Sequence, residues 1–155
     1  TTLHREGSVA RYVKMVKEAG IPVKMVPIEL TESAAFLSIQ IKELTKSLTE
    51  AGFSLDLDDF GSGYSSMMSL SILPFDVVKI DKSLVDLIGD KQGDVVLEAV
   101  INLAKKLGKK VVAEGVEDKY QLEALRKLGC DLIQGHYFSK PVKEAEFMEL
   151  LKTRC

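Results

Sequence analysis

Segments typical of β-strands and α-helices alternate along this 155-residue chain, and nothing between them signals a β-hairpin. Such an alternation favours parallel strands joined by helical crossovers. The expected strands are short and nearly all apolar, as in sheets covered on both faces. The sequence therefore predicts one α/β domain over residues 1–155, with residues 1–7 as a disordered or non-native N-terminus. Strands are expected at residues 23–30, 53–58, 76–81, 110–114 and 130–134, and helices at 8–19, 37–48, 65–73, 94–107, 122–128 and 144–152.

Charge and hydropathy exclude several classes of protein. The 21 basic and 23 acidic residues are interspersed and give a net charge of −2, so no basic patch marks a nucleic-acid surface. No apolar run approaches the ~20 residues that span a bilayer, and the first residues lack the apolar core of a signal peptide. Cys130 and Cys155 are too far apart in sequence to suggest a disulfide framework or a zinc site. We expect a cytoplasmic chain that binds no DNA and has no membrane segment.

Polar side chains stand at or near the end of every expected strand, where ligands bind in parallel α/β folds. The neighbouring carboxylates Asp58 and Asp59 repel each other, so a fold that gathers them usually also brings cations; the alternative is a polar turn. Lys79 lies between Val78 and Ile80, where a lysine is costly unless it is paired or deprotonated; alternatively it reaches solvent from an edge strand. The strand-end set is Glu29, Asp58, Asp59, Lys79, Glu114 and Gln134.

Other candidates have ordinary structural explanations. Glu32 and Glu117 are interpreted as first-turn acids that a helix dipole favours. Neither histidine has a partner at ligand spacing, and Tyr137 and Phe138 are expected in the core. The residues alone predict a metal-assisted site, and they leave open a metal-dependent α/β barrel enzyme that acts on phosphate or enolate substrates.

Five motifs stand in order along the chain. They are Glu-Leu-Thr-Glu-Ser at 29–33, Asp-Asp-Phe-Gly-Ser-Gly-Tyr-Ser-Ser at 58–66, Lys-Ile-Asp at 79–81, Ala-Glu-Gly-Val-Glu at 113–117 and Gln-Gly-His-Tyr-Phe-Ser-Lys-Pro at 134–141. In order and spacing they resemble the motifs of the EAL domain family, and the match runs from about Ser8 to the C-terminus. This resemblance implies a modified TIM barrel that hydrolyses cyclic di-GMP to linear pGpG with two Mg²⁺ or Mn²⁺ ions.

The resemblance implies a set of metal ligands. Glu29 and Asp58 would bind metal directly, and Asp59 would hold or bridge the second ion. Glu117 would contact the metal site or the substrate beside it. No other substrate-binding residue is identified.

The resemblance also implies catalytic and supporting roles. Lys79 would position the attacking water or help to deprotonate it. Glu114 and Gln134 would support the network of metal and water. Glu32 would anchor the loop at residues 60–66, which couples dimerisation to metal binding.

The chain departs from the family pattern in its first residues. Neither the Glu-Ala-Leu segment nor the strand with a metal-binding asparagine is found upstream of Ser8. The sequence therefore predicts about five of eight strand–helix units, an incomplete two-metal site and very low activity of the isolated chain. Five units cannot close a barrel, so we expect a homodimer or an element-swapped oligomer. A non-catalytic cyclic-di-GMP-binding or protein-interaction module is the alternative, and GGDEF or sensory domains are expected in a longer parent protein.

Overall fold

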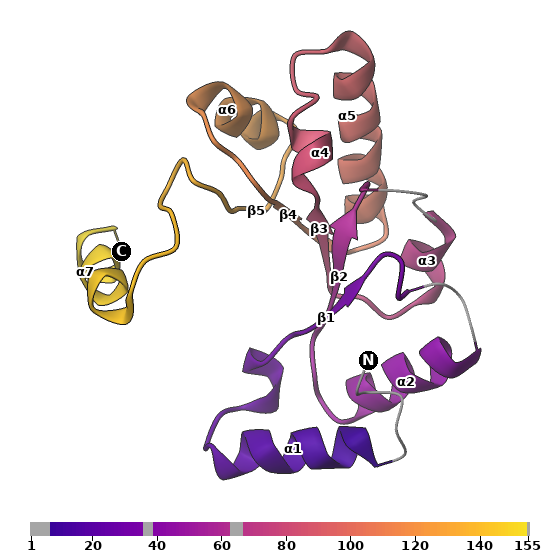
Figure 1. Cartoon of the computed structure of the whole chain (residues 1–155). Coiled ribbons are helices and arrows are strands. Elements are labelled where there is room, and N and C mark those ends of the chain that lie inside the picture. The colour runs from indigo at the N-terminus through magenta and orange to yellow at the C-terminus, as the bar shows by residue number, and fades with distance from the viewer. Residues whose placement is uncertain (1–6, 36–38, 63–66, 155) are drawn as a thin grey trace.

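The chain folds around a five-stranded parallel sheet in the order β1-β2-β3-β4-β5, as predicted (Figure 1). The computed structural model describes residues 7–35, 39–62 and 67–154. The strands are β1 (Ile28–Thr31), β2 (Leu55–Phe60), β3 (Val77–Ile80), β4 (Lys110–Ala113) and β5 (Leu132–Ile133). The helices are α1 (Ser8–Glu18), the 3₁₀ helix η1 (Val23–Met25), α2 (Ile39–Glu50), α3 (Met67–Ile72), α4 (Lys82–Val85), α5 (Lys91–Lys106), α6 (Lys119–Lys127) and α7 (Glu144–Arg154).

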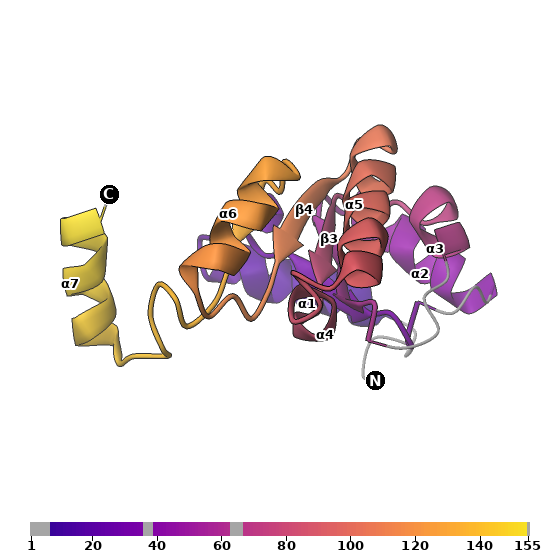
Figure 2. The same cartoon turned by 90° about the horizontal axis from the view of Figure 1, so that it is seen from above.

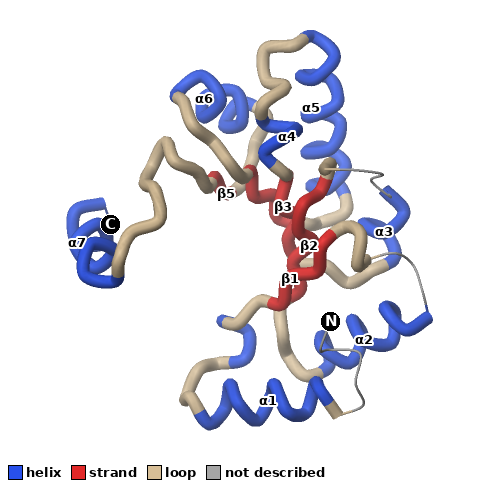
Figure 3. Tube along the Cα trace, in the orientation of Figure 1, coloured by secondary structure: helices blue, strands red, loops and turns tan. Residues whose placement is uncertain are grey.

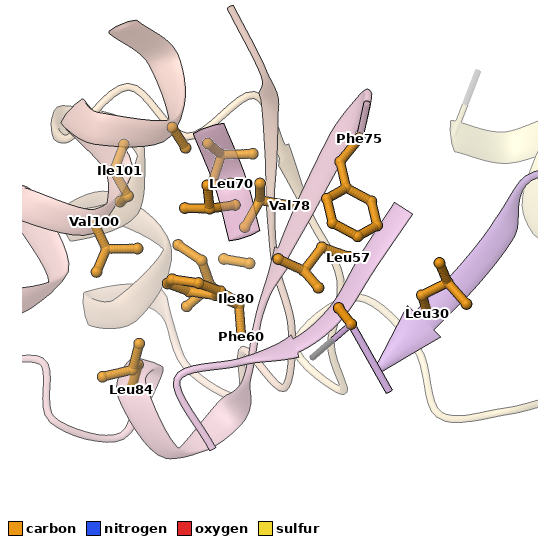
Figure 4. Packing of buried hydrophobic residues seen from close by; sticks show 14 of the residues in the cluster. Leu30, Leu57, Phe60, Leu70, Phe75, Val78, Ile80, Leu84, Val100 and Ile101 are labelled. Atoms are coloured by element: carbon orange, nitrogen blue, oxygen red, sulfur yellow. The ribbon is translucent and has the colours of Figure 1, made fainter. Parts of the chain in front are cut away.

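One face of the sheet is covered by helices and the other is open (Figures 2 and 3). Side chains alternate along a strand, so Leu55 and Leu57 are buried under the helices while Asp56 and Asp58 face the open side. Figure 4 shows the helix side, where Ile80 packs with residues of the neighbouring elements. The open face therefore carries the polar residues that the strands leave uncovered.

Proline placement corrects the expected first strand. Pro22 precedes η1, and Pro27 is exposed immediately before β1. Because proline lacks a backbone donor, pairing with β2 begins at Ile28, not Val23.

Helix boundaries also differ from the sequence pattern. Asp81 caps α4 by accepting a bond from the amide of Ser83, in a stretch that carried no helix prediction. Asp90 caps α5 through Gln92 and Gly93 and starts that helix at Lys91. Both corrections come from Asp residues acting as N-caps. α1 begins at Ser8, and its N-cap residue is Gly7 in a left-handed conformation.

The C-terminal helix stands away from the sheet at the end of an extended segment (Figures 1 and 2). Tyr137 and Phe138 lie in that segment, are 40% and 37% exposed, and pack edge to face. The prediction that they belong to the core is wrong, because no layer covers them. An open groove of about 710 Å³ lies between the segment and α7, with Ile133, Phe138, Val142, Phe147, Leu150 and Leu151 among its lining residues.

Asp131 ties the start of β5 to its neighbours. Its carboxylate accepts a bond from the Val111 amide at 2.8 Å and pairs with Lys105 at 3.0 Å. The amide of Val111, and then Lys105, hold the pKa of Asp131 below its usual value.

We expect Asp131→Asn to lower the free energy of unfolding by about 1 kcal/mol at neutral pH, through the lost charge-assisted bonds. A carboxylate whose pKa is lower in the folded state stabilises the fold at pH values above its unfolded-state pKa. This contribution is lost as the pH falls through the folded-state pKa. The difference from wild type should therefore shrink below about pH 4. Urea unfolding at pH 7 and pH 3.5 measures it, and a difference that grows in acid would contradict the assignment.

No helix in the described ranges is long and apolar enough to cross a bilayer.

Candidate functional site

Three carboxylates from three strands or strand ends surround one lysine on the open face. The Nζ atom of Lys79, in β3, lies 2.8 Å from Glu29 Oε1, 2.9 Å from Asp58 Oδ1 and 2.9 Å from Glu114 Oε1. Glu29 lies in β1, Asp58 in β2, and Glu114 directly after β4. Parallel strands bring these residues together because their carboxyl ends share one edge. We call this group the Lys79 cluster.

Burial and charge oppose each other at Lys79, whose side chain is 13% exposed. Burial alone would lower its pKa, but the close negative carboxylates of Glu29, Glu114 and Asp58 outweigh burial, and the pKa of Lys79 is raised. Lys79 is therefore a cation at neutral pH. It can orient and attract an anionic or polar group, and its predicted role toward the attacking water stays a prediction.

A bulge in β2 places two acids opposite one residue of β3. Leu57 pairs with Val78 and Phe60 with Ile80, so Asp58 and Asp59 both oppose Lys79. Asp59 has a φ of 56°, a left-handed conformation that aspartate tolerates better than most residues. The bulge extends β2 past the expected end at Asp58, and the alternation of apolar residues contained no sign of it.

One carboxylate oxygen of Asp58 accepts no hydrogen bond from the described part of the protein. Its Oδ1 is buried and receives no hydrogen bond of regular geometry, although Lys79 Nζ is within ion-pair distance. Buried oxygens normally have a donor or a cation, and carboxylates are the ligands of Mg²⁺ and Mn²⁺. The donor set of the Lys79 cluster thus fits a divalent cation. In the described ranges, no three His, Cys, Asp or Glu side chains lie close enough together to hold a metal without rearrangement.

Glu32 contacts the start of the glycine loop. Its Oε2 accepts a bond from the Gly61 amide at 3.1 Å. Gly61 has a φ of 99°, and a Cβ there would overlap the side chain of Leu84. This fixes residues 60–62 beside Glu32, while 63–66 lie outside the described residues. The loop-anchoring role of Glu32 stays a prediction that this bond supports.

We expect Glu32→Ala to speed hydrogen exchange of the Gly61 amide about five-fold, which corresponds to a local loss of about 1 kcal/mol. Exchange followed by NMR measures it, and Glu50→Ala on exposed α2 is the matched control. Equal exchange in both variants would mean that Glu32 does not anchor the loop.

Glu117 and Gln134 do not join the Lys79 cluster. Glu117 is exposed and lies 3.4 Å from Lys82. Gln134 is exposed, and its backbone bonds to Ala113 and Val116. The metal role predicted for Glu117 and the catalytic role predicted for Gln134 stay predictions.

Sequence reasoning missed Asp56 as a member of the open face. It pairs in register with Glu29 and precedes Asp58 by two residues on the same side of β2. Burial, and then the neighbouring Glu29, raise the pKa of Asp56. The signal was its two-residue spacing from Asp58 in a strand.

A parallel strand–helix sheet with acids and a lysine at its carboxyl edge is the arrangement of α/β-barrel enzymes. A family model described as "EAL domain" matches residues 1–141. The chain belongs to the EAL domain family. The resemblance drawn from its motifs is thereby confirmed.

Individual relatives agree with this membership. Over 154 residues the chain is 40% identical to cyclic di-GMP phosphodiesterase NbdA of Pseudomonas aeruginosa, covering 98% of this chain and 20% of that protein. The EAL domain of Mycobacterium smegmatis DcpA superposes with a TM-score of 0.87 at 36% identity, covering 96% and 67%. Klebsiella pneumoniae BlrP1, in a manganese and cyclic-di-GMP complex at pH 6, superposes with a TM-score of 0.84 at 33% identity, covering 90% and 36%. The chain thus spans a fifth of NbdA and matches part of the EAL barrel.

Proposed function

We propose that this chain carries part of the catalytic centre of an EAL-type phosphodiesterase that hydrolyses cyclic di-GMP to linear pGpG. The observation that supports this is the Lys79 cluster, where three carboxylates from separate strands lie within 2.9 Å of one ammonium group. The names of NbdA and of the BlrP1 complex add the substrate class. The geometry supports a cation-binding site that acts on a phosphate group. The guanine part of the proposed substrate comes from the names of the relatives.

The residues of the cluster have separable tasks in this proposal. Glu29, Asp58 and Glu114 would hold Mg²⁺ or Mn²⁺, with Asp59 beside them on the bulge. When bound, such ions polarise the phosphate and make water more acidic. Lys79, which is a cation in this structure, orients the attacking water toward phosphorus. The water oxygen forms a bond to phosphorus and gives up a proton to solvent. One ester P–O bond breaks, and the leaving oxygen takes up a proton from solvent.

Turnover of cyclic di-GMP by the 155-residue chain with Mn²⁺ tests this proposal, with pGpG separated by chromatography. We expect slow hydrolysis in wild type and none in Asp58→Asn, with Glu43→Gln on exposed α2 as the control. Calorimetric binding without pGpG would instead favour the non-catalytic binding module. Absence of both binding and turnover would contradict the proposal for this chain. Rapid turnover would contradict the prediction that its metal site is incomplete.

The open sheet leads to an expectation about assembly. Within the described ranges, β1 pairs with β2 alone and β5 with β4 alone. Leu132, in β5, is 57% exposed. Unpaired strand edges and bare apolar side chains favour association.

We expect the apparent mass in light scattering to exceed one chain and to rise with protein concentration. Replacing Leu132 by lysine should lower that mass, because charges on edge strands oppose pairing. Val95→Lys, on the exposed side of α5, is the control. A monodisperse monomer at all concentrations would contradict a homodimer or element-swapped oligomer.

A further inference from the structure

One lysine in β3 and one at the start of α4 face two glutamates that follow β4, with the same spacing in both pairs. Lys79 lies 2.9 Å from Glu114, and Lys82 lies 3.4 Å from Glu117. Each pair of like residues is three positions apart. The first glutamate belongs to the Lys79 cluster, whereas the second pairs with Lys82.

The stem of Lys82 occupies the space that Gly115 leaves free. A Cβ on Gly115 would lie 2.6 Å from both Cβ and Cγ of Lys82. Lys82 therefore crosses from the start of α4 to the loop after β4. Its ammonium is shared, because Asp86 in the same turn lies 2.8 Å from Nζ.

The backbone at Glu117 is fixed without help from Lys82. The Glu117 amide donates to Gln121 Oε1 at 2.8 Å, and the Val116 amide donates to the Gln134 carbonyl at 3.1 Å. Lys82 consequently acts on the Glu117 carboxylate and not on the position of the loop. The Glu117 side chain is 54% exposed.

We propose that Lys82 is a positioning residue that holds the Glu117 carboxylate away from a divalent cation and thereby weakens cation binding. This inference rests on the proposed function, since it takes the Lys79 cluster as the cation site. When Glu117 turns toward the cation, Lys82 keeps Asp86 as its partner. This movement of Glu117 therefore breaks one exposed ion pair, between Lys82 and Glu117, and such pairs contribute little. Removing the lysine charge should favour the cation-bound position of Glu117.

Binding of Mn²⁺ alone to the full chain, followed by the electron paramagnetic resonance signal of free Mn²⁺, tests the inference. Lys82→Met keeps the stem over Gly115 and removes the charge. It should tighten Mn²⁺ binding about two- to five-fold, the value of one exposed ion pair. Lys119→Met is the matched control, because Lys119 forms a similar pair with Glu123 on α6. In a Glu117→Gln background, Lys82→Met should have no effect.

Asp86→Asn should act in the opposite direction. Without the Asp86 carboxylate, Lys82 keeps its ion pair with Glu117 and should hold that carboxylate more firmly. We expect Mn²⁺ binding to weaken about two-fold, with Glu123→Gln as the control for loss of one negative charge.

The outcomes separate this inference from the proposed function. If wild type binds Mn²⁺ but Lys82→Met binds it no more tightly than Lys119→Met does, the inference is overturned while the cation site stands. Weaker binding by Lys82→Met than by wild type would overturn it in the same way. A gain that persists in the Glu117→Gln background would also overturn it. No binding by wild type or Lys82→Met at millimolar Mn²⁺ would overturn both. Opposite shifts in Lys82→Met and Asp86→Asn support it.

Discussion

Replacing Lys79 by methionine should lower the free energy of unfolding by about 3 kcal/mol, because it leaves three mutually repelling carboxylates without their common cation. Lys79 is 13% exposed and contacts Glu29, Asp58 and Glu114 at 2.8–2.9 Å. Solvent therefore screens the contacts with Asp58 and Glu114 weakly, whereas Glu29 is half exposed and contributes less. Urea unfolding at pH 7 measures the loss.

The matched control is Lys46→Met. Lys46 pairs with Glu50 at 3.8 Å, with both side chains largely exposed, and we expect less than about 0.5 kcal/mol. Millimolar Mn²⁺ should restore part of the stability of Lys79→Met, because a bound cation stabilises the folded state. Equal losses in the two variants would show that the cluster does not depend on its lysine.

Replacing Gly135 by alanine should cost about 3 kcal/mol or more, since the added carbon meets backbone that cannot rotate aside. A Cβ at Gly135 would overlap the backbone O and N atoms of Val116. The same contact carries two hydrogen bonds, from Val116 to Gln134 and from Tyr137 to Val116. The variant should separate the loop after β4 from the segment after β5.

Gly108→Ala is the control for this prediction. Gly108 has a φ of 74° and nothing within 4 Å of an added Cβ, so its expected cost is the conformational one of about 1 kcal/mol. Thermal or urea unfolding compares the two. Hydrogen exchange at the Val116 and Tyr137 amides should rise in Gly135→Ala, and similar behaviour of both variants would refute the close approach.

The parallel sheet and the Lys79 cluster were largely predictable from sequence. Strand–helix alternation predicts parallel order, and parallel order alone predicts that Glu29, Asp58 and Glu114 end at one edge with Lys79. The structure places these four side chains together. Their catalytic roles remain predictions.

Other features depend on contacts that a one-dimensional pattern does not contain. The bulge at Asp58 and Asp59 arises from pairing with β3. The partner of Glu117 is Lys82, 35 positions earlier, and its approach depends on Gly115 having no side chain. Tyr137 and Phe138 looked like core residues because their apolarity says nothing about whether another layer covers them.

The two free borders of the sheet have a geometric consequence. The β1 border and the β5 border are different surfaces, so joining one copy to the next through them is a head-to-tail contact. Two five-stranded arcs also contain more strands than the eight that close a TIM barrel. Head-to-tail association of copies therefore closes into a ring only if their sheets flatten or exchange segments. Otherwise further copies add and a filament forms.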